Sequence, residues 1–122
     1  MNKRPIPVTI IGWVYIATGA VGMAYHFSDL NAGSVFQYDA LWIELVRMSA
    51  VVCGAFMLRG CDWARWVALA WIGFHVILSA FHTLPELAMH CLFFAVIAWF
   101  LFRGDAARYF RGRRKAARSE AN

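Results

Sequence analysis

Four long apolar runs, separated by short polar connections, constrain the fold of this chain more than any other feature of its sequence. They cover residues 8–25, 40–58, 62–82 and 85–102. Each run is close to the roughly 20 residues that an α-helix needs to cross about 30 Å of hydrocarbon. The pattern predicts an all-α membrane protein with four transmembrane helices in an up-down bundle, followed by a basic tail over residues 103–122.

The overall composition agrees with a membrane environment. Hydrophobic residues make up 61% of the 122 residues and charged residues 16%, against roughly 45–50% and about 25% in soluble domains. A soluble domain of this length has a high surface-to-volume ratio and could not bury so much apolar surface. The length leaves room for one domain. These values favour a small integral membrane protein over a soluble one.

The basic residues are segregated along the chain in a way that predicts the orientation of the bundle. Eleven of the twelve lie on segments that a four-span topology places on one side: Lys3, Arg4, Arg59, Arg65 and the seven from Arg103 to Arg118. The opposite side carries the acids Asp29, Asp39, Glu44 and Glu86. Because Lys- and Arg-rich segments stay in the cytoplasm, the sequence predicts a bacterial inner-membrane protein with both termini inside. The net charge of +5 is then explained without nucleic-acid binding.

Small residues and a capping motif indicate how the helices meet. Gly12, Gly19 and Gly22 fall near one face of the first run, and Gly54 lies four residues after an alanine in the second. In lipid, such residues let helices approach closely, so we expect these faces to contact a neighbour. Residues 83–86, with the sequence TLPE, fit the capping box that starts a helix.

Polar residues inside the apolar runs form a first candidate site, because ionisable groups in a membrane are costly and often functional. Glu44 and Arg47 are three residues apart on one helical face, and His75 and Ser79 are four apart on the next helix. Together they are predicted to form a polar cluster in the outer half of the membrane, with an Arg47–His75 contact across two helices. The cluster would either fix the packing of the helices or hold a proton or a small anionic ligand.

Histidines near the outer boundary form a second candidate site. His26, His82, Glu86 and His90 would supply imidazole and carboxylate ligands for a metal ion. A haem with two histidine ligands would need a pair at equal depth, such as His75 with His90. No bound cofactor is the favoured interpretation, and a metal or haem remains the alternative. We predict no catalytic residue, because no acid is placed to orient a histidine beside Ser79.

The tail is predicted to contact the membrane surface or a partner protein. Its basic residues would be attracted to anionic lipid by about 1 kcal/mol each, and Tyr109 and Phe110 would enter the lipid interface if the segment is helical. The contact residues are Arg108, Arg111, Arg113, Arg114 and Lys115.

The chain resembles a group of small bacterial four-span membrane proteins that has no established activity. The matching stretches are PVTIIGWVYIATGAVG, WIELVRMSAVVCG, LRGCDWARWVALAWIGFHVILSAFH, PELAMHCLFFAVIAWFLFR and RYFRGR, which together cover nearly the whole chain. The resemblance implies the four-span topology and supplies no catalytic residues.

Two classes of function follow from the sequence. The favoured class is a non-enzymatic accessory subunit that packs in the lipid bilayer with its own copies or with a larger membrane complex. The alternative is an outward-facing polar-site protein that binds a metal or haem, a proton or a small anionic ligand through its His, Glu and Arg residues.

Overall fold

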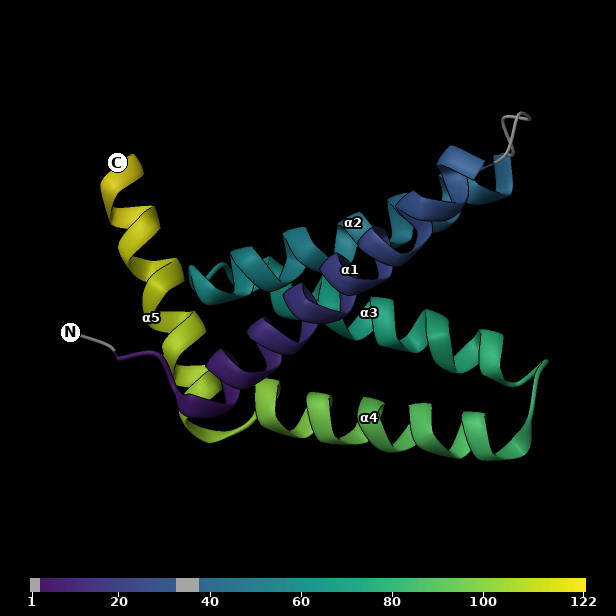
Figure 1. Ribbon diagram of the computed structural model, residues 1–122. Helices are drawn as coiled ribbons and strands as arrows, with labels where there is room; N and C mark the ends of the chain where they lie inside the picture. Colours follow the sequence, from purple (N-terminus) through teal and green to yellow (C-terminus); the bar gives the residue numbers. More distant parts are fainter. Residues whose placement is uncertain (1–2, 33–37) are drawn as a thin grey trace.

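Five α-helices make up the computed structural model, which describes residues 3–32 and 38–122. The helices are α1 (Ile6–Ala32), α2 (Tyr38–Leu58), α3 (Asp62–Ser79), α4 (Leu84–Phe102) and α5 (Gly104–Ala121). Figure 1 shows α1 to α4 running lengthwise, with α5 turned across the end at which the N-terminal segment lies. Within the described residues there is no β-strand, so the predicted all-α class is confirmed.

Among the helices of the described residues, three are long and apolar enough to cross a membrane. They are α1 over Ile6–Phe27, α2 over Leu41–Leu58 and α4 over Leu84–Phe102. The first helix continues to Ala32, well past the predicted end at residue 25. The third helix has 18 residues and carries Asp62 and Arg65 in its first turns, and it is not among these three. The membrane character predicted from composition thus rests most directly on α1, α2 and α4.

Most side chains of α4 are apolar and lie at the surface of the molecule. Leu101 is its one buried residue, whereas Leu92, Phe93 and Trp99 are all exposed. Surface of this kind is unfavourable in water and is well solvated by lipid tails. The helix therefore presents the side of the bundle that suits contact with hydrocarbon.

The first two helices pack against each other through glycines. A β-carbon added at Gly54 would lie 2.5 Å from the carbonyl oxygen of Gly12, and one added at Gly19 would lie 2.7 Å from the carbonyl oxygen of Arg47. Contacts this short mean that the two backbones touch at these positions. The prediction that the glycine faces contact a neighbouring helix is confirmed, and that neighbour belongs to the same chain.

The connection between α3 and α4 follows the predicted capping motif in part. Thr83 is the N-cap of α4, and its hydroxyl accepts a hydrogen bond from the backbone N–H of Glu86 at 3.4 Å. The Glu86 carboxylate, which would complete a capping box, lies 3.8 Å from the Nδ1 of His82. Helix α3 ends at Ser79, three residues before the predicted end of its span.

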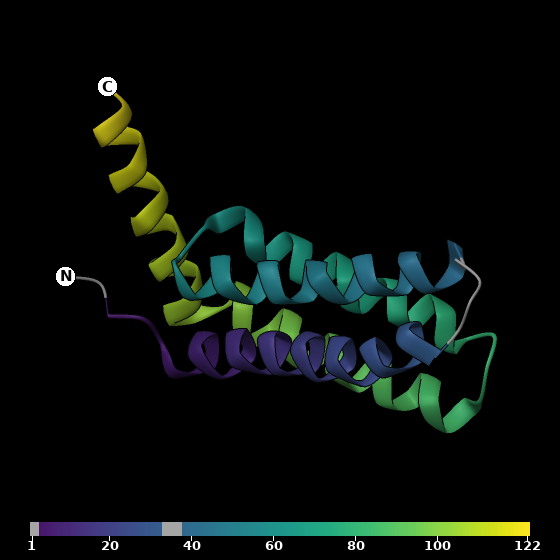
Figure 2. The same ribbon diagram turned by 45° about the horizontal axis from the view of Figure 1, so that its top comes forward.

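The tail is a helix that packs on the bundle through its aromatic residues. Phe110 is fully buried and Tyr109 is 7% exposed, and both belong to the core together with Met57 and Leu101. Gly60 has a φ of +82° and leaves space for the Tyr109 hydroxyl, which would lie 2.8 Å from an added β-carbon. The prediction that these two aromatics enter the lipid interface is therefore wrong. Figure 2 shows α5 leaving the bundle end at an angle, with its last turns beyond the other helices.

Candidate functional site

A serine and two histidines form a polar cluster between α3 and α4. The Ser79 hydroxyl lies 2.7 Å from Nδ1 of His90 and donates to the backbone carbonyl of His75 at 2.8 Å. The ring centroids of His75 and His90 are 6.0 Å apart. Ser79 is 2% exposed, so this link between the two helices is shielded from the surroundings.

The contacts of Nδ1 favour one tautomer in both rings. The Nδ1 of His75 lies 2.9 Å from the carbonyl oxygen of Trp71, and the Nδ1 of His90 lies 2.9 Å from the carbonyl oxygen of Glu86. A carbonyl oxygen only accepts hydrogen bonds, so these contacts favour the tautomer with the hydrogen on Nδ1 in both rings. In the neutral form, each Nε2 then keeps its lone pair. The cluster offers two neighbouring imidazoles with the same atom available for a proton or a ligand.

Aromatic contacts tie this cluster to the rest of the bundle. The ring of Trp71 lies 4.0 Å from that of His75, and its Nε1 donates to the carbonyl oxygen of Val46 on α2 at 3.0 Å. Tyr15 on α1 lies 5.3 Å from Trp71 and donates to the carbonyl oxygen of Ala68 at 2.7 Å. These bonds satisfy indole and phenol donors that would be costly to leave unpaired in the membrane.

Arg47 lies toward α1 instead of α3. Its guanidinium donates to the carbonyl oxygen of Gly22 at 2.7 Å and pairs with Glu44 at 3.3 Å. A β-carbon at position 22 would lie 3.0 Å from the Nε of Arg47, so the absence of a side chain there makes room for the guanidinium. The hydrogen bonds of Arg47 to described residues involve neither His75 nor Ser79. The predicted cluster thus divides into an Arg47–Glu44 pair and the His75–Ser79–His90 group.

We predict that Arg47→Leu lowers the free energy of unfolding by about 1–2 kcal/mol, because hydrogen bonds between membrane helices are worth roughly this much or less. Chemical denaturation of the purified protein in detergent, followed by circular dichroism, measures the change. The control is Met48→Leu, which alters an exposed neighbour on the same helix and is expected to leave stability unchanged. Equal stability of both variants would contradict a packing role for Arg47.

The four predicted metal ligands are not gathered into one set. His82 lies beside Glu86, whereas His90 is turned toward Ser79 on α3. Across residues 3–32 and 38–122, no group of three or more His, Cys, Asp or Glu side chains is placed to hold a metal ion, and His26 belongs to no such group. Glu86 and His90 share a helical face, but their side chains contact different residues. Glu86 lies beside His82, which follows the end of α3, whereas His90 lies beside Ser79, the last residue of that helix.

A charged cluster at the other end of α3 was not recognised in the sequence. Arg65 pairs with Asp62 at 2.7 Å, and Asp62 also pairs with Arg114 of α5 at 3.4 Å. The Arg65 guanidinium lies 4.8 Å from the ring centroid of Phe102 and 5.4 Å from that of Phe110. The spacing of Asp62 and Arg65, three residues apart, was the available signal, but Arg65 was interpreted as a cytoplasmic charge that fixes orientation.

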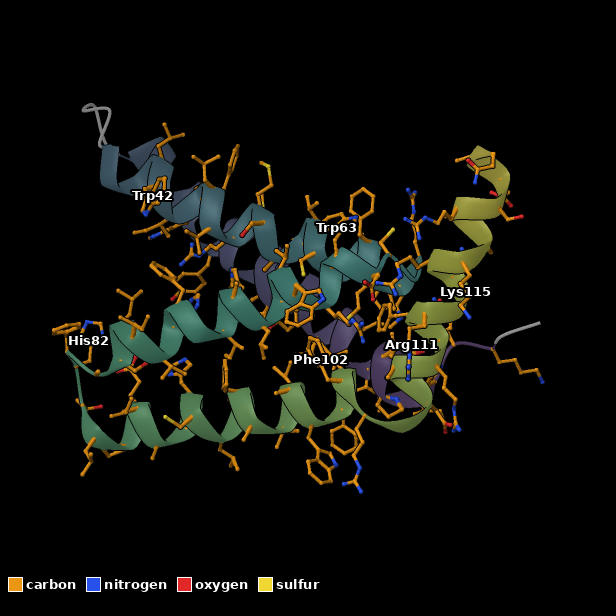
Figure 3. All side chains as sticks on the ribbon, turned by 180° about the vertical axis from the view of Figure 1, so that it is seen from behind. Trp42, Trp63, His82, Phe102, Arg111 and Lys115 are labelled. Carbon is orange, nitrogen blue, oxygen red and sulfur yellow. The ribbon has the colours of Figure 1, made fainter. Side chains whose placement is uncertain are left out.

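The five predicted contact residues of the tail divide into three groups. Arg113 donates to the carbonyl oxygen of Arg59 at 3.0 Å, and Arg114 pairs with Asp62, so both hold α5 to the α2–α3 turn. Arg108 pairs with Asp105. Arg111 and Lys115 are exposed on α5, and Figure 3 shows both at the end of the molecule opposite His82.

Comparison with known proteins gives no relative: the chain matches no family model, no curated protein and no solved structure.

Proposed function

We propose that this chain is a small non-enzymatic protein of the bacterial inner membrane that serves as an accessory subunit of a larger membrane complex. In this proposal four helices cross the membrane, both termini lie in the cytoplasm, and α5 is the part that contacts the partner. The observation that carries the proposal is the attachment of α5 to the bundle, with Arg111 and Lys115 exposed on its surface. The resemblance to small bacterial four-span proteins is consistent with it.

The attachment of α5 supports a docking role because it limits the entropy lost on binding. Phe110 is buried in the core, and Arg113 and Arg114 bond to the α2–α3 turn. Arg111 and Lys115 remain exposed on the same helix. A fixed basic helix at the cytoplasmic boundary complements an acidic cytoplasmic surface on a neighbouring membrane protein.

The same ion pairs support α3 as the fourth span. Asp62 and Arg65 are the charged residues of α3, and they pair with each other at its first turn. A paired acid and base near the membrane boundary cost far less than isolated charges at the centre. The remaining helix from residue 66 is apolar apart from His75 and Ser79, and the Nδ1 of His75 and the hydroxyl of Ser79 are hydrogen-bonded within the bundle.

The test is migration of the tagged protein after mild-detergent extraction from its native host. The wild type is expected to migrate far above the mass of its 13.8 kDa chain. Arg111→Gln/Lys115→Gln is expected to lower the fraction in the large complex about tenfold, since two exposed charge pairs are worth up to about 1.4 kcal/mol together. The control Lys3→Gln/Arg59→Gln removes as many charges from outside α5. Equal loss in both variants, or migration at the monomer mass, contradicts the proposal.

The alternative function is an outward-facing polar site for a metal or haem, a proton or a small anion. The observation that favours it is the pair of imidazoles, 6.0 Å apart, whose Nε2 atoms keep their lone pairs. Metal analysis and a visible absorption spectrum of the purified protein test the metal and haem forms. His90→Leu should then abolish the signal, whereas Cys91→Ser, at an exposed neighbouring position, should preserve it.

A further inference from the structure

A large basic groove lies where the N-terminal segment meets the corner between α4 and α5. Its volume is about 910 Å³, and its basic lining residues are Lys3, Arg4, Arg103 and Arg108. Trp99 and Phe100, from the last turn of α4, line the same groove and are exposed. Basic and apolar surfaces therefore meet within one cavity, at the end of a helix that suits a membrane span.

Two of the basic side chains are held in place by contacts within the protein. Arg4 donates from Nε to the Thr9 hydroxyl at 2.9 Å and from its terminal nitrogen to the carbonyl oxygen of Leu58 at 2.8 Å. The Arg103 guanidinium lies 4.0 Å from the ring centroid of Trp99, which is close for a cation over an aromatic ring. These contacts position both guanidinium groups, and none of them involves a carboxylate.

The charge of the groove is strongly unbalanced. Asp105 is the one acid among its lining residues, and it pairs with Arg108. Lys3, Arg4 and Arg103 thus have no anionic partner among the residues that line the cavity. Three cationic side chains that line one groove without a counter-charge favour a multiply hydrogen-bonding anion such as phosphate.

We propose that this groove binds the phosphate-bearing headgroup of an anionic lipid. The basic residues contact the phosphate, while Trp99 and Phe100 contact the glycerol and the start of the acyl chains. A soluble phosphate compound would use the basic wall alone, so the apolar wall favours an amphiphile. The site lies at the start of α5, its lining does not include Arg111 or Lys115, and it goes beyond the proposed accessory role.

The experiment is native mass spectrometry of the full chain, released from detergent with either phosphatidylglycerol or phosphatidylcholine added in equal amounts. The wild type is expected to retain phosphatidylglycerol preferentially. Lys3→Gln/Arg103→Gln is expected to weaken this binding about 30-fold, from the loss of two headgroup contacts. The matched control is Arg59→Gln/Arg118→Gln, which removes two charges outside the groove and is expected to bind like the wild type.

Further arms separate the sources of phosphate and guard against misfolding. Glycerol phosphate in solution is expected not to displace the lipid; displacement at equimolar concentration would overturn the lipid assignment. The single variant Arg103→Lys, in which Lys3 is unchanged, keeps the charge and is expected to retain most of the wild-type binding. Circular dichroism checks that each variant keeps the wild-type helicity. Equal weakening in the groove and control variants, or equal retention of the two lipids, would overturn the proposal.

Discussion

Replacing Gly54 by alanine is expected to lower the free energy of unfolding by about 2 kcal/mol, within the range for overpacked interiors. The added methyl group would lie 2.5 Å from the carbonyl oxygen of Gly12 and 2.8 Å from the side chain of Ile16. The closer atom belongs to the backbone of α1, so relief requires the two helices to separate. Helix propensity acts in the opposite direction, since alanine is favoured over glycine by about 1 kcal/mol. A loss of stability in Gly54→Ala would therefore come from the contact with α1 and not from helix propensity.

The matched control for this substitution is Gly73→Ala on α3. A β-carbon there meets Phe94 at 3.5 Å, which is ordinary van der Waals contact with a side chain. This variant is expected to be as stable as the wild type or more stable by up to about 1 kcal/mol. Denaturation in mixed micelles, followed by circular dichroism, compares both with the wild type. If Gly54→Ala were as stable as Gly73→Ala, the close approach of α1 and α2 would be wrong.

The features that the sequence predicted correctly depend on residues close together in the chain. Apolar runs predicted the helices, glycine spacing predicted a contact face on α1, and the residues from Thr83 to Glu86 predicted the start of α4. Each of these signals is contained within one or two helical turns. The partner of the glycine face was not predicted, because small residues indicate that a close contact exists without specifying which helix supplies it.

The candidate site was predicted less well because depth in a membrane does not specify the rotation of a helix about its axis. Arg47 and His75 were placed at similar depths, yet Arg47 extends to Gly22 on α1. His90 was grouped with His82 and Glu86, yet it bonds to Ser79. The burial of Phe110 was also not predicted, because the sequence of a basic tail does not indicate that an aromatic residue in it packs against the bundle.

Replacing Arg65 by methionine is expected to lower the free energy of unfolding by about 3 kcal/mol, the lower end of the range for breaking a buried ion pair. The Arg65 side chain is 10% exposed and pairs with Asp62, which is itself 17% exposed. Its loss leaves the carboxylate with the more distant Arg114 as partner. It also removes the cation that lies close to the rings of Phe102 and Phe110. The control, Arg118→Met, changes an exposed arginine and is expected to remain within about 0.5 kcal/mol of the wild type.

A double-mutant cycle separates the ion pair from the packing of the Arg65 side chain. Asp62→Asn/Arg65→Met removes both charges, and it is expected to recover most of the stability lost in Arg65→Met, because apolar or neutral replacements of a buried pair are often tolerated. If the double variant instead loses as much stability as Asp62→Asn and Arg65→Met lose in sum, Arg65 acts through its aromatic contacts alone. The distinction bears on topology. If the pair is strongly coupled, α3 carries no unpaired charge into the bilayer, and its first turn can lie at the membrane boundary beneath α5.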